Sequence, residues 1–279
     1  MTVGVVIFSR LDSKRLPGKA LRTFGGWKRP LLGRVIDRIL PRLDSKSLLS
    51  RALRTFGGPS RPLLGHVIDR AKSAKTPDMV IVATSDRPTD DPIAAFAKRE
   101  GVKVFRGSAL DVLGRGLACA EAFQLTALGR FCGDSPFMPP EVIDRLIAIH
   151  EKEQPEITTN VFPRSYPMGM TFEIISIDAL RHLAGLTDDP YDREHMTSYI
   201  YKHADEFRIR NVESDPKIDN WDGWPLTVDS LSDLSHANYL SISLRESHRR
   251  VSLKNVLELT QEYRQTTKKD LALQKREGT

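Results

Sequence analysis

The side chains best suited to chemistry follow the first apolar run of the chain. The segment SRLDSKRLPGK, residues 9–19, contains four cations, a glycine that lets the backbone approach a ligand closely, and a proline that stiffens the turn. A triphosphate needs these features in its binding loop. The segment differs from the GxxxxGK(S/T) phosphate loop, because the first glycine is missing and Ala20 follows Lys19. Since a solvated basic loop has the same composition, the spacing alone leaves both interpretations open.

Two aspartates occupy similar positions farther along the chain. Asp134 ends the predicted strand ALGRFCGD, and Asp229 ends PLTVD, which we also expect to be a strand. Ligands of open α/β sheets bind at the carboxyl ends of the strands, so two carboxylates there predict a Mg²⁺ site that substrate phosphates and water complete. Each aspartate can instead be the N-cap of the helix that follows it.

The remaining polar groups argue against covalent catalysis. The histidines are dispersed, and only His195 lies in a dense polar cluster, beside Arg193 and Glu194. The sequence contains no recognisable Ser-His-Asp or Cys-His arrangement, so we do not expect a covalent intermediate. The two cysteines, Cys119 and Cys132, lack metal-ligand spacing and indicate no disulfide framework.

Alternating strands and helices must position these residues. Short β-branched runs predict buried strands, and amphipathic stretches between them predict helices. The expected strands are 2–9, 79–84, 102–107 and 127–134, and the expected helices are 30–39, 91–101, 109–123 and 139–153. This alternation predicts an open, mostly parallel α/β sheet with helices on both faces. Strands at 156–162 and 171–177 and a helix at 193–204 predict a mixed-sheet continuation. We expect one domain over 1–242 and a helical, polar tail over 243–279.

Net charge is concentrated in two segments. The chain has 279 residues and a formal charge of +6. Residues 42–73 hold seven Lys and Arg against two Asp and Glu, and residues 244–279 hold nine against five. Because the excess lies there and no basic face carries interleaved aromatics, we expect no nucleic-acid partner. The chain shows no leader pattern and no apolar stretch near the ~20 residues of a membrane span, so we expect a cytoplasmic protein with no membrane partner.

One segment of the chain occurs twice. Residues 10–38 and 42–70 are identical at 22 of 29 positions, with an offset of 32 residues. Only the first copy follows a strand and keeps Pro17, Gly18 and Lys19, so only it can form the nucleotide loop. The helix of either copy, 30–39 or 62–72, can pack on the sheet. We favour 30–39, which keeps loop and helix contiguous, and we therefore expect deletion of 42–73 to preserve or improve activity.

Seven segments, in order, resemble a known family. They are VVIFSRLDSKRLPGKAL, VIVATSDRPTDDPI, VKVFRGSALDVLGR, GDSPFMPPEVID, NVFPRSYPMGMTFEI, DPYDREHMTSYIY and LTVDSLSDL. Together they resemble the cytidylyltransferases that activate acidic sugars, and among these the spore-coat polysaccharide biosynthesis protein F type. The resemblance implies a nucleotide-diphospho-sugar transferase (Rossmann-like) fold. It also implies that CTP and a small acidic sugar give a CMP-sugar and pyrophosphate, with Mg²⁺ as cofactor. Relatives are commonly homodimers.

The resemblance also implies roles for individual residues. The phosphates of the nucleotide would be held by the loop residues Arg10, Ser13, Arg15, Gly18 and Lys19, and Mg²⁺ by Asp134 and Asp229. Lys19, Arg10 and Asp134 would be catalytic. Arg106 would contact the nucleotide or only stabilise the turn before Asp111. The sugar would face Glu173, Arg193, Glu194 and His195.

Two positions depart from the pattern of that family. Met168 stands where relatives have an acidic residue, and Pro225 stands where an arginine is common. Two other functions also stay open at this point. The chain could be a glycosyltransferase that uses a nucleotide-sugar, although GDSP is not the Asp-x-Asp motif of those enzymes. It could also be a homologue whose catalysis the duplication has impaired.

Overall fold

A seven-stranded sheet organises the molecule. The computed structural model describes residues 1–26, 60–215, 217–218 and 225–277, with side chains to 266. The strand order is β5-β4-β1-β6-β8-β7-β9. The strands are β1 (Val3–Phe8), β4 (Met79–Ser85), β5 (Lys103–Gly107), β6 (Ala127–Cys132), β7 (Ile157–Thr159), β8 (Phe172–Ser176) and β9 (Ile209–Asn211). Strands β5, β4, β1 and β6 pair in parallel, whereas β8 is antiparallel to β6 and to β7. The mostly parallel sheet with a mixed second half is therefore confirmed.

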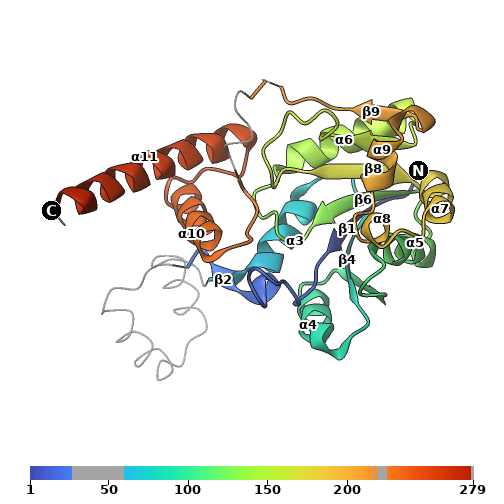
Figure 1. The fold of residues 1–279 in the computed structure, drawn as a ribbon, viewed down its shortest axis with the longest axis horizontal. Helices are drawn as coiled ribbons and strands as arrows, with labels where there is room; N and C mark the ends of the chain where they lie inside the picture. Colours follow the sequence, from blue (N-terminus) through green and yellow to red (C-terminus); the bar gives the residue numbers. More distant parts are fainter. Residues whose placement is uncertain (27–59, 216, 219–224, 278–279) are drawn as a thin grey trace.

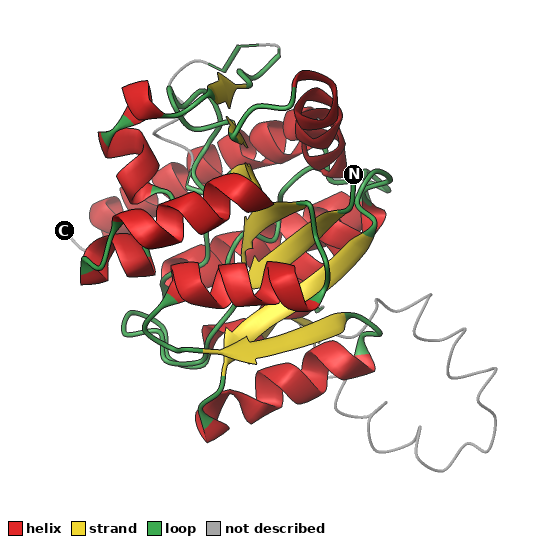
Figure 2. Ribbon diagram, turned by 90° about the vertical axis from the view of Figure 1, so that its right-hand side faces the viewer, coloured by secondary structure: helices red, strands yellow, loops and turns green. Residues whose placement is uncertain are grey.

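Helices cover both faces of the sheet (Figures 1 and 2). The reason lies in the central strand, where Val5 and Ile7 belong to one buried core and Val6 belongs to the other. Successive side chains of a strand point to opposite faces, so an all-apolar strand needs a helical layer on each side. The first layer contains α3 (Leu63–Ser73), α4 (Asp91–Arg99), α6 (Pro140–Glu153), α10 (Leu231–Glu246) and α11 (Leu253–Glu277). The second contains α5 (Val112–Ala122), α7 (Ile177–Leu186) and α9 (Ser198–Lys202), and the short α8 (Pro190–Glu194) packs against α5.

One predicted strand is absent from the structure. Residues 225–229, the segment PLTVD, form no strand. Two backbone hydrogen bonds hold the segment instead, from the Leu226 N–H to the Met168 oxygen at 2.8 Å and from the Val228 N–H to the Asp134 oxygen at 3.0 Å. The apolar side chains that suggested a strand, Leu226 and Val228, are buried in the main core. Alternate residues of this segment are therefore buried, although the segment does not pair with any strand of the described chain.

The helix of the second copy packs on the sheet, and our placement of the repeat was wrong. Helix α3 belongs to residues 62–73 of the second copy, and it contacts β1, β4 and α6. Leu63, Leu64, Val67 and Ile68 of this helix are fully buried. The helix predicted at 30–39 lies outside the described residues. Because the core position belongs to α3, deletion of 42–73 would remove a core helix.

The two ends of the described chain around this gap lie side by side. Strand β2 (Thr23–Phe24), which follows the first loop, pairs antiparallel with β3 (Arg61–Pro62), which precedes α3. A Cβ built on Gly26 would lie 2.8 Å from the Ser60 Cβ. The loop of the first copy and the helix of the second copy are thus joined in space, as they would be in a chain with a single copy.

The C-terminal helices pack on the main body. Helices α10 and α11 contact each other, and Leu244, Val256 and Leu259 are buried in the main core. The predicted boundary at residue 242 falls inside α10 and stays a prediction. In the part of the chain that the structure describes, no helix is both long enough and apolar enough to cross a membrane.

Candidate active site

The loop after β1 is a closed turn that ends at a left-handed glycine. The Gly18 N–H donates to the Leu11 oxygen at 3.1 Å, and the Leu11 N–H donates to the Asp90 Oδ1 at 2.8 Å. Gly18 has a φ of 69°, which favours glycine over any residue with a side chain. It precedes the short 3₁₀ helix η1 (Lys19–Leu21), which begins with the lysine. The serine at the matching position of the second copy, Ser50, is poorly suited to this conformation.

The Lys19 ammonium lies between the two predicted metal ligands. Its Nζ is 2.8 Å from the Asp134 Oδ2 and 2.8 Å from the Asp229 Oδ1. Burial lowers the pKa of Lys19, but Asp134 and then Asp229 outweigh this effect, and the pKa is raised above its ordinary value. The ammonium is therefore charged at neutral pH. A second cation, the Arg15 guanidinium, lies 3.6 Å from the Asp229 Oδ2.

Different elements bring the two aspartates together. Asp134 lies two residues beyond the end of β6, and Gly133 allows the turn to pass close to the Phe8 carbonyl, since a Cβ there would lie 2.8 Å from that oxygen. Asp229 directly precedes Ser230, the N-cap of α10. The hydrogen bond from Val228 to the backbone of Asp134 fixes their proximity. Asp229 itself is not the cap, so its carboxylate is available for Lys19.

A cleft of about 590 Å³ opens beside this cluster. This volume is in the range of small-molecule sites. The predicted residues that line the cleft are Arg10, Ser13, Arg15, Lys19, Asp134, Glu194, His195 and Asp229. Six basic side chains line it in all: Arg10, Lys14, Arg15, Lys19, Arg115 and Arg130. Such a concentration of cations around a few carboxylates suits a polyanionic ligand.

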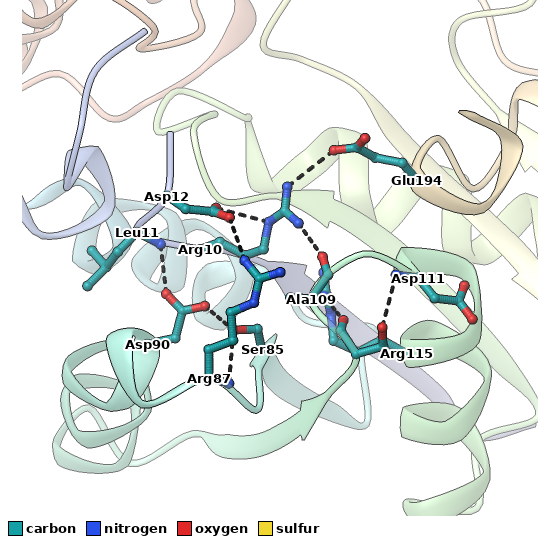
Figure 3. A network of polar contacts seen from close by, with 11 residues as sticks. Arg10, Leu11, Asp12, Ser85, Arg87, Asp90, Ala109, Asp111, Arg115 and Glu194 are labelled. Atoms are coloured by element: carbon teal, nitrogen blue, oxygen red, sulfur yellow. Dashed lines mark hydrogen bonds and ion pairs between the residues drawn. The ribbon is translucent and has the colours of Figure 1, made fainter. Parts of the chain in front are cut away.

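Arg10 is held in place from three directions (Figure 3). Its Nε lies 3.3 Å from the Asp12 Oδ1, its Nη2 lies 3.2 Å from the Glu194 Oε1, and its Nη1 donates to the Ala109 carbonyl. Glu194 is thus an ion-pair partner of Arg10 as well as a lining residue. These contacts fix the guanidinium at the mouth of the cleft while both its partners remain about half exposed.

Two lining arginines were missed in the sequence. Arg115, on α5, is 2% exposed, donates to the Ser108 carbonyl, and lies with its guanidinium carbon 5.7 Å from the Phe8 ring centroid. Burial, and then the neighbouring Arg10, lower the pKa of Arg115 to about 10, so it remains a cation at neutral pH. Arg130 lies on β6. An arginine within an otherwise apolar buried strand is the signal that could have identified it.

Glu173 supports Arg130 from beneath the cleft. Its side chain is 1% exposed and accepts hydrogen bonds from Arg130 Nη1 and from the Tyr201 hydroxyl. Burial, and then the Glu173 carboxylate, raise the pKa of Tyr201, which keeps its hydroxyl protonated as a donor. The Tyr201 oxygen also lies 2.8 Å from the Thr159 Oγ1. Glu173 is therefore enclosed, and the group that it orients toward the cleft is Arg130.

Besides Glu173, three predicted residues do not line the cleft: Gly18, Arg106 and Arg193. Arg106 bonds to Asp91 and to the Ser85 and Arg87 carbonyls, so the structure offers a role in stabilising the turns around α4. Arg193 forms a two-pronged ion pair with Asp111, the N-cap of α5. The ligand roles of both arginines stay predictions.

The paired aspartates have the donor chemistry for a hard divalent cation. Each uses one carboxylate oxygen for Lys19, while the second oxygen of Asp134 lies 3.3 Å from the Ser135 hydroxyl and the second oxygen of Asp229 lies 3.6 Å from the Arg15 guanidinium. Within the described residues, no group of three or more His, Cys, Asp and Glu side chains could hold a metal. Two carboxylates nevertheless fit Mg²⁺, which retains water and shares substrate phosphates rather than occupying an all-protein cage.

Known proteins resemble this chain over most of its length. The family model described as cytidylyltransferase matches residues 5–41 and 38–272. The spore coat polysaccharide biosynthesis protein SpsF of Bacillus subtilis is 29% identical over 230 residues, which cover 82% of this chain and 81% of that protein. The break between the two matched stretches falls within the repeat.

Solved structures share the fold. A cytidylyltransferase from Leptospira borgpetersenii has a TM-score of 0.74 and 25% identity, with 96% of each chain covered. A CMP:2-keto-3-deoxy-manno-octonic acid synthetase complexed with CTP has a TM-score of 0.57 and 17% identity, with 88% of this chain and all of the other covered. At that identity the second likeness concerns the fold alone.

Proposed function

The chain belongs to the cytidylyltransferase family, and from this premise we propose that it transfers a cytidylyl group from CTP to a hydroxyl of an acidic sugar. The products would be a CMP-sugar and pyrophosphate, and the pathway would be the synthesis of a polysaccharide or surface glycan. The observation that carries the proposal is the Lys19 ammonium, 2.8 Å from each of two aspartates at the edge of a cleft rich in arginine and lysine.

The relatives support the choice of donor, acceptor and pathway. The synthetase that shares the fold was solved with CTP and is named for an acidic sugar. The Bacillus relative is named for spore coat polysaccharide biosynthesis. In this chain, the basic side chains around the cleft are suited to a triphosphate and to a carboxylate on the acceptor. The choice of CTP and of an acidic sugar rests on these two kinds of support together.

The side chains of the first loop would bind the triphosphate. Arg10, Arg15 and Lys19 line the cleft, and Ser13 lies at the same wall. As the sugar oxygen attacks the α-phosphate and pyrophosphate departs, negative charge grows on the departing oxygen. Fixed cations lower the barrier because they are already oriented when that charge develops. Gly18 contributes only through its backbone conformation, which places Lys19.

Mg²⁺ would be held by Asp134 and Asp229, and when bound it would neutralise phosphate charge. The acceptor would lie toward Arg130, Glu194 and His195, which line the cleft beyond Cys132. Arg130, on β6, and Asp134, two residues beyond the end of that strand, both line the cleft.

A pyrophosphate-release assay tests the proposal. The purified chain is incubated with each of four nucleoside triphosphates and a panel of acidic sugars, in Mg²⁺. We expect release with CTP and at least one acidic sugar. The Asp229→Asn variant should lose at least 100-fold in rate, or about 2.7 kcal/mol in barrier. Asp178→Asn, which changes a 90% exposed carboxylate, is the matched control and should not change the rate.

The outcomes separate the alternatives. Binding of CTP with no pyrophosphate release for any sugar would indicate a catalytically impaired homologue. Transfer of a sugar from a nucleotide-sugar to an acceptor, without pyrophosphate, would indicate a glycosyltransferase. Either result would contradict the proposed reaction.

A further inference from the structure

The two basic segments of the sequence meet at a second cavity. A cavity of about 590 Å³ lies between α3, α6 and the end of α10, on the far side of the Asp134 turn from the active-site cleft. Its basic side chains come from the second copy and from the C-terminal region. They are Arg70 and Lys75 from the first segment and its continuation, and Arg245, Arg249 and Arg250 from the second. We call this space the arginine cavity.

Two guanidinium groups in the arginine cavity lack a carboxylate partner. In the described part of the chain, neither Arg70 nor Arg245 forms an ion pair, and the Nη2 of Arg245 is buried without a hydrogen bond. Burial is the largest influence on Arg70 and lowers its pKa, and Asp69 and Glu141 offset this effect only in part. A partly buried cation without a partner is costly, so an arrangement that places two of them in one cavity suits an anion.

The acidic side chains of the arginine cavity do not neutralise it. Two line it, Glu141 and Asp144, against five basic ones, of which Arg249 is paired with Glu258 outside the cavity lining. Asp144 is already occupied, because its Oδ1 accepts from the Lys75 N–H at 2.7 Å, the Thr76 N–H at 2.9 Å and the Thr76 hydroxyl at 2.8 Å. The active-site cleft, by comparison, has six basic and four acidic side chains, so the arginine cavity has the larger proportion of cations.

The remaining wall also favours an anion. Pro140 and Glu141, at the start of α6, line the cavity, and the start of this helix has no side-chain cap. The first turn of a 14-residue helix presents the positive end of its dipole. His66 lies at the opposite wall, where burial lowers its pKa to about 4, so it is neutral at physiological pH and adds no charge. The cationic character therefore comes from the arginines and Lys75.

We propose that the arginine cavity is a binding site for a small phosphate-bearing metabolite, separate from the active site. Its volume suits a small molecule. Arginines that approach from α3 and α10 match the several oxygens of a phosphate, which accept paired hydrogen bonds from more than one side. The site does not depend on the proposed function, since none of its lining residues lines the active-site cleft.

One short turn and two ring contacts connect the arginine cavity to the active-site cleft. Pro136 and Phe137 line the arginine cavity and follow Asp134 by two and three residues. Phe24 lies three residues after η1. Its ring stacks on the His66 ring with 4.1 Å between the centroids, and its centroid lies 6.4 Å from that of the Phe137 ring. Residues that line the cavity are therefore connected, by sequence or by ring contacts, to the segments that position Lys19 and Asp134.

Calorimetric titration with inorganic pyrophosphate, at fixed ionic strength and without Mg²⁺, tests the site. The background is the full chain with Lys19→Gln and Arg15→Gln, which weakens binding at the active-site cleft. We expect one pyrophosphate still to bind. Adding Arg70→Gln and Arg245→Gln should weaken that binding at least tenfold. Adding Arg208→Gln and Arg210→Gln, which removes two exposed charges elsewhere, should leave it unchanged.

Several results would overturn the proposal. These are no pyrophosphate binding in the Lys19 and Arg15 background, equal binding with and without the cavity arginines, or equally tight binding of succinate, which carries carboxylates in place of phosphates. If the double cavity variant does not fold, Arg250→Glu replaces it. Arg250 also lines the cavity and is exposed, so its reversal of charge should fold and should also weaken binding. Pyrophosphate release by the unmodified enzyme is a separate measurement, so failure here leaves the proposed reaction intact.

Discussion

At the scale of single residues, Lys19 decides the electrostatics of the active site. Without it, the Asp134 and Asp229 carboxylates would face each other with only Arg15 nearby, at 3.6 Å from one of them. With it, the cluster of two carboxylates and two cations is close to neutral. The first copy of the repeat supplies this lysine, because Gly18 gives the turn that delivers it.

We predict that Lys19→Met lowers the rate of pyrophosphate release at least 100-fold, which corresponds to about 2.7 kcal/mol of transition-state stabilisation. The physical reason is the loss of a fixed cation between two carboxylates. Lys103→Met, at an exposed position on β5, is the matched control. Equal loss in both variants would show that the effect is not specific to the site.

A second prediction concerns Glu173, which is buried and paired with Arg130. Glu173→Gln leaves Arg130 without its counter-charge, and we expect the free energy of unfolding in urea to fall by roughly 2–4 kcal/mol. The exposed pair of Arg181 and Glu121 gives the control, because Glu121→Gln should cost less than about 1 kcal/mol. An equally small cost for Glu173→Gln would contradict the structural role given to this pair.

At the scale of elements, the fold takes different parts from the two copies of the repeat. The loop comes from the first copy and the core helix α3 from the second, and β2 and β3 join them. The repeat therefore need not disturb the active site, since Gly26 and Ser60 adjoin each other in the fold.

This arrangement predicts which deletion is tolerated. Removal of residues 27–58 joins Gly26 to Pro59 and keeps all of α3, so we expect activity within about twofold of the parent and a change in unfolding free energy below about 1 kcal/mol. Removal of 42–73 places Arg34 at the position of His66 and Ile39 at that of Ala71, which is 1% exposed. Overpacking of this kind costs roughly 1–3 kcal/mol.

Urea denaturation and pyrophosphate release of the two deletion variants check this prediction. The parent chain is the reference for both measurements. Greater stability of the 42–73 deletion would mean that the helix of the first copy fits the sheet better than α3.

At the scale of the whole molecule, three histidines link folding to pH. His66 on α3, His150 on α6 and His236 on α10 each have a pKa lowered from 6.5 to about 4, mainly by burial. In the unfolded chain these histidines begin to bind protons near pH 6.5, whereas in the folded chain they do not. Their protonation therefore does not reduce the free energy of unfolding above pH 6.5, where the stability that they contribute is fully present. It is lost as the pH falls from 6.5 toward 4.

We predict that His150→Gln reduces this sensitivity to acid. His150 is 1% exposed, and its Nδ1 lies 2.9 Å from the Thr158 hydroxyl, a contact that glutamine can replace. Between pH 7 and pH 5 the variant should lose about 2 kcal/mol less unfolding free energy than the parent. Urea denaturation at both pH values measures the difference, with the exposed His248→Gln as the control. If the variant and the parent lost the same unfolding free energy between pH 7 and pH 5, the result would contradict the burial of His150.

The sequence by itself determined the local features of this protein. The apolar runs specified the strands, since all-apolar strands need helices on both faces. The segments around the basic loop, Asp134 and Asp229 identified the family, and Pro17, Gly18 and Lys19 marked which copy could form the loop. These conclusions depend on residue type and short-range order, which can be read directly from the sequence.

The tertiary structure decided what depends on distance through space. It placed Lys19 between two aspartates that are 115 and 210 positions away in the chain, and it enclosed Glu173 beneath Arg130. It chose α3 over the copy of that helix earlier in the chain, because the choice rests on packing against β1, β4 and α6 and not on the nearly identical helix sequences. It also brought Arg70 and Arg245 to one cavity, where charges that are far apart in the sequence act on the same ligand.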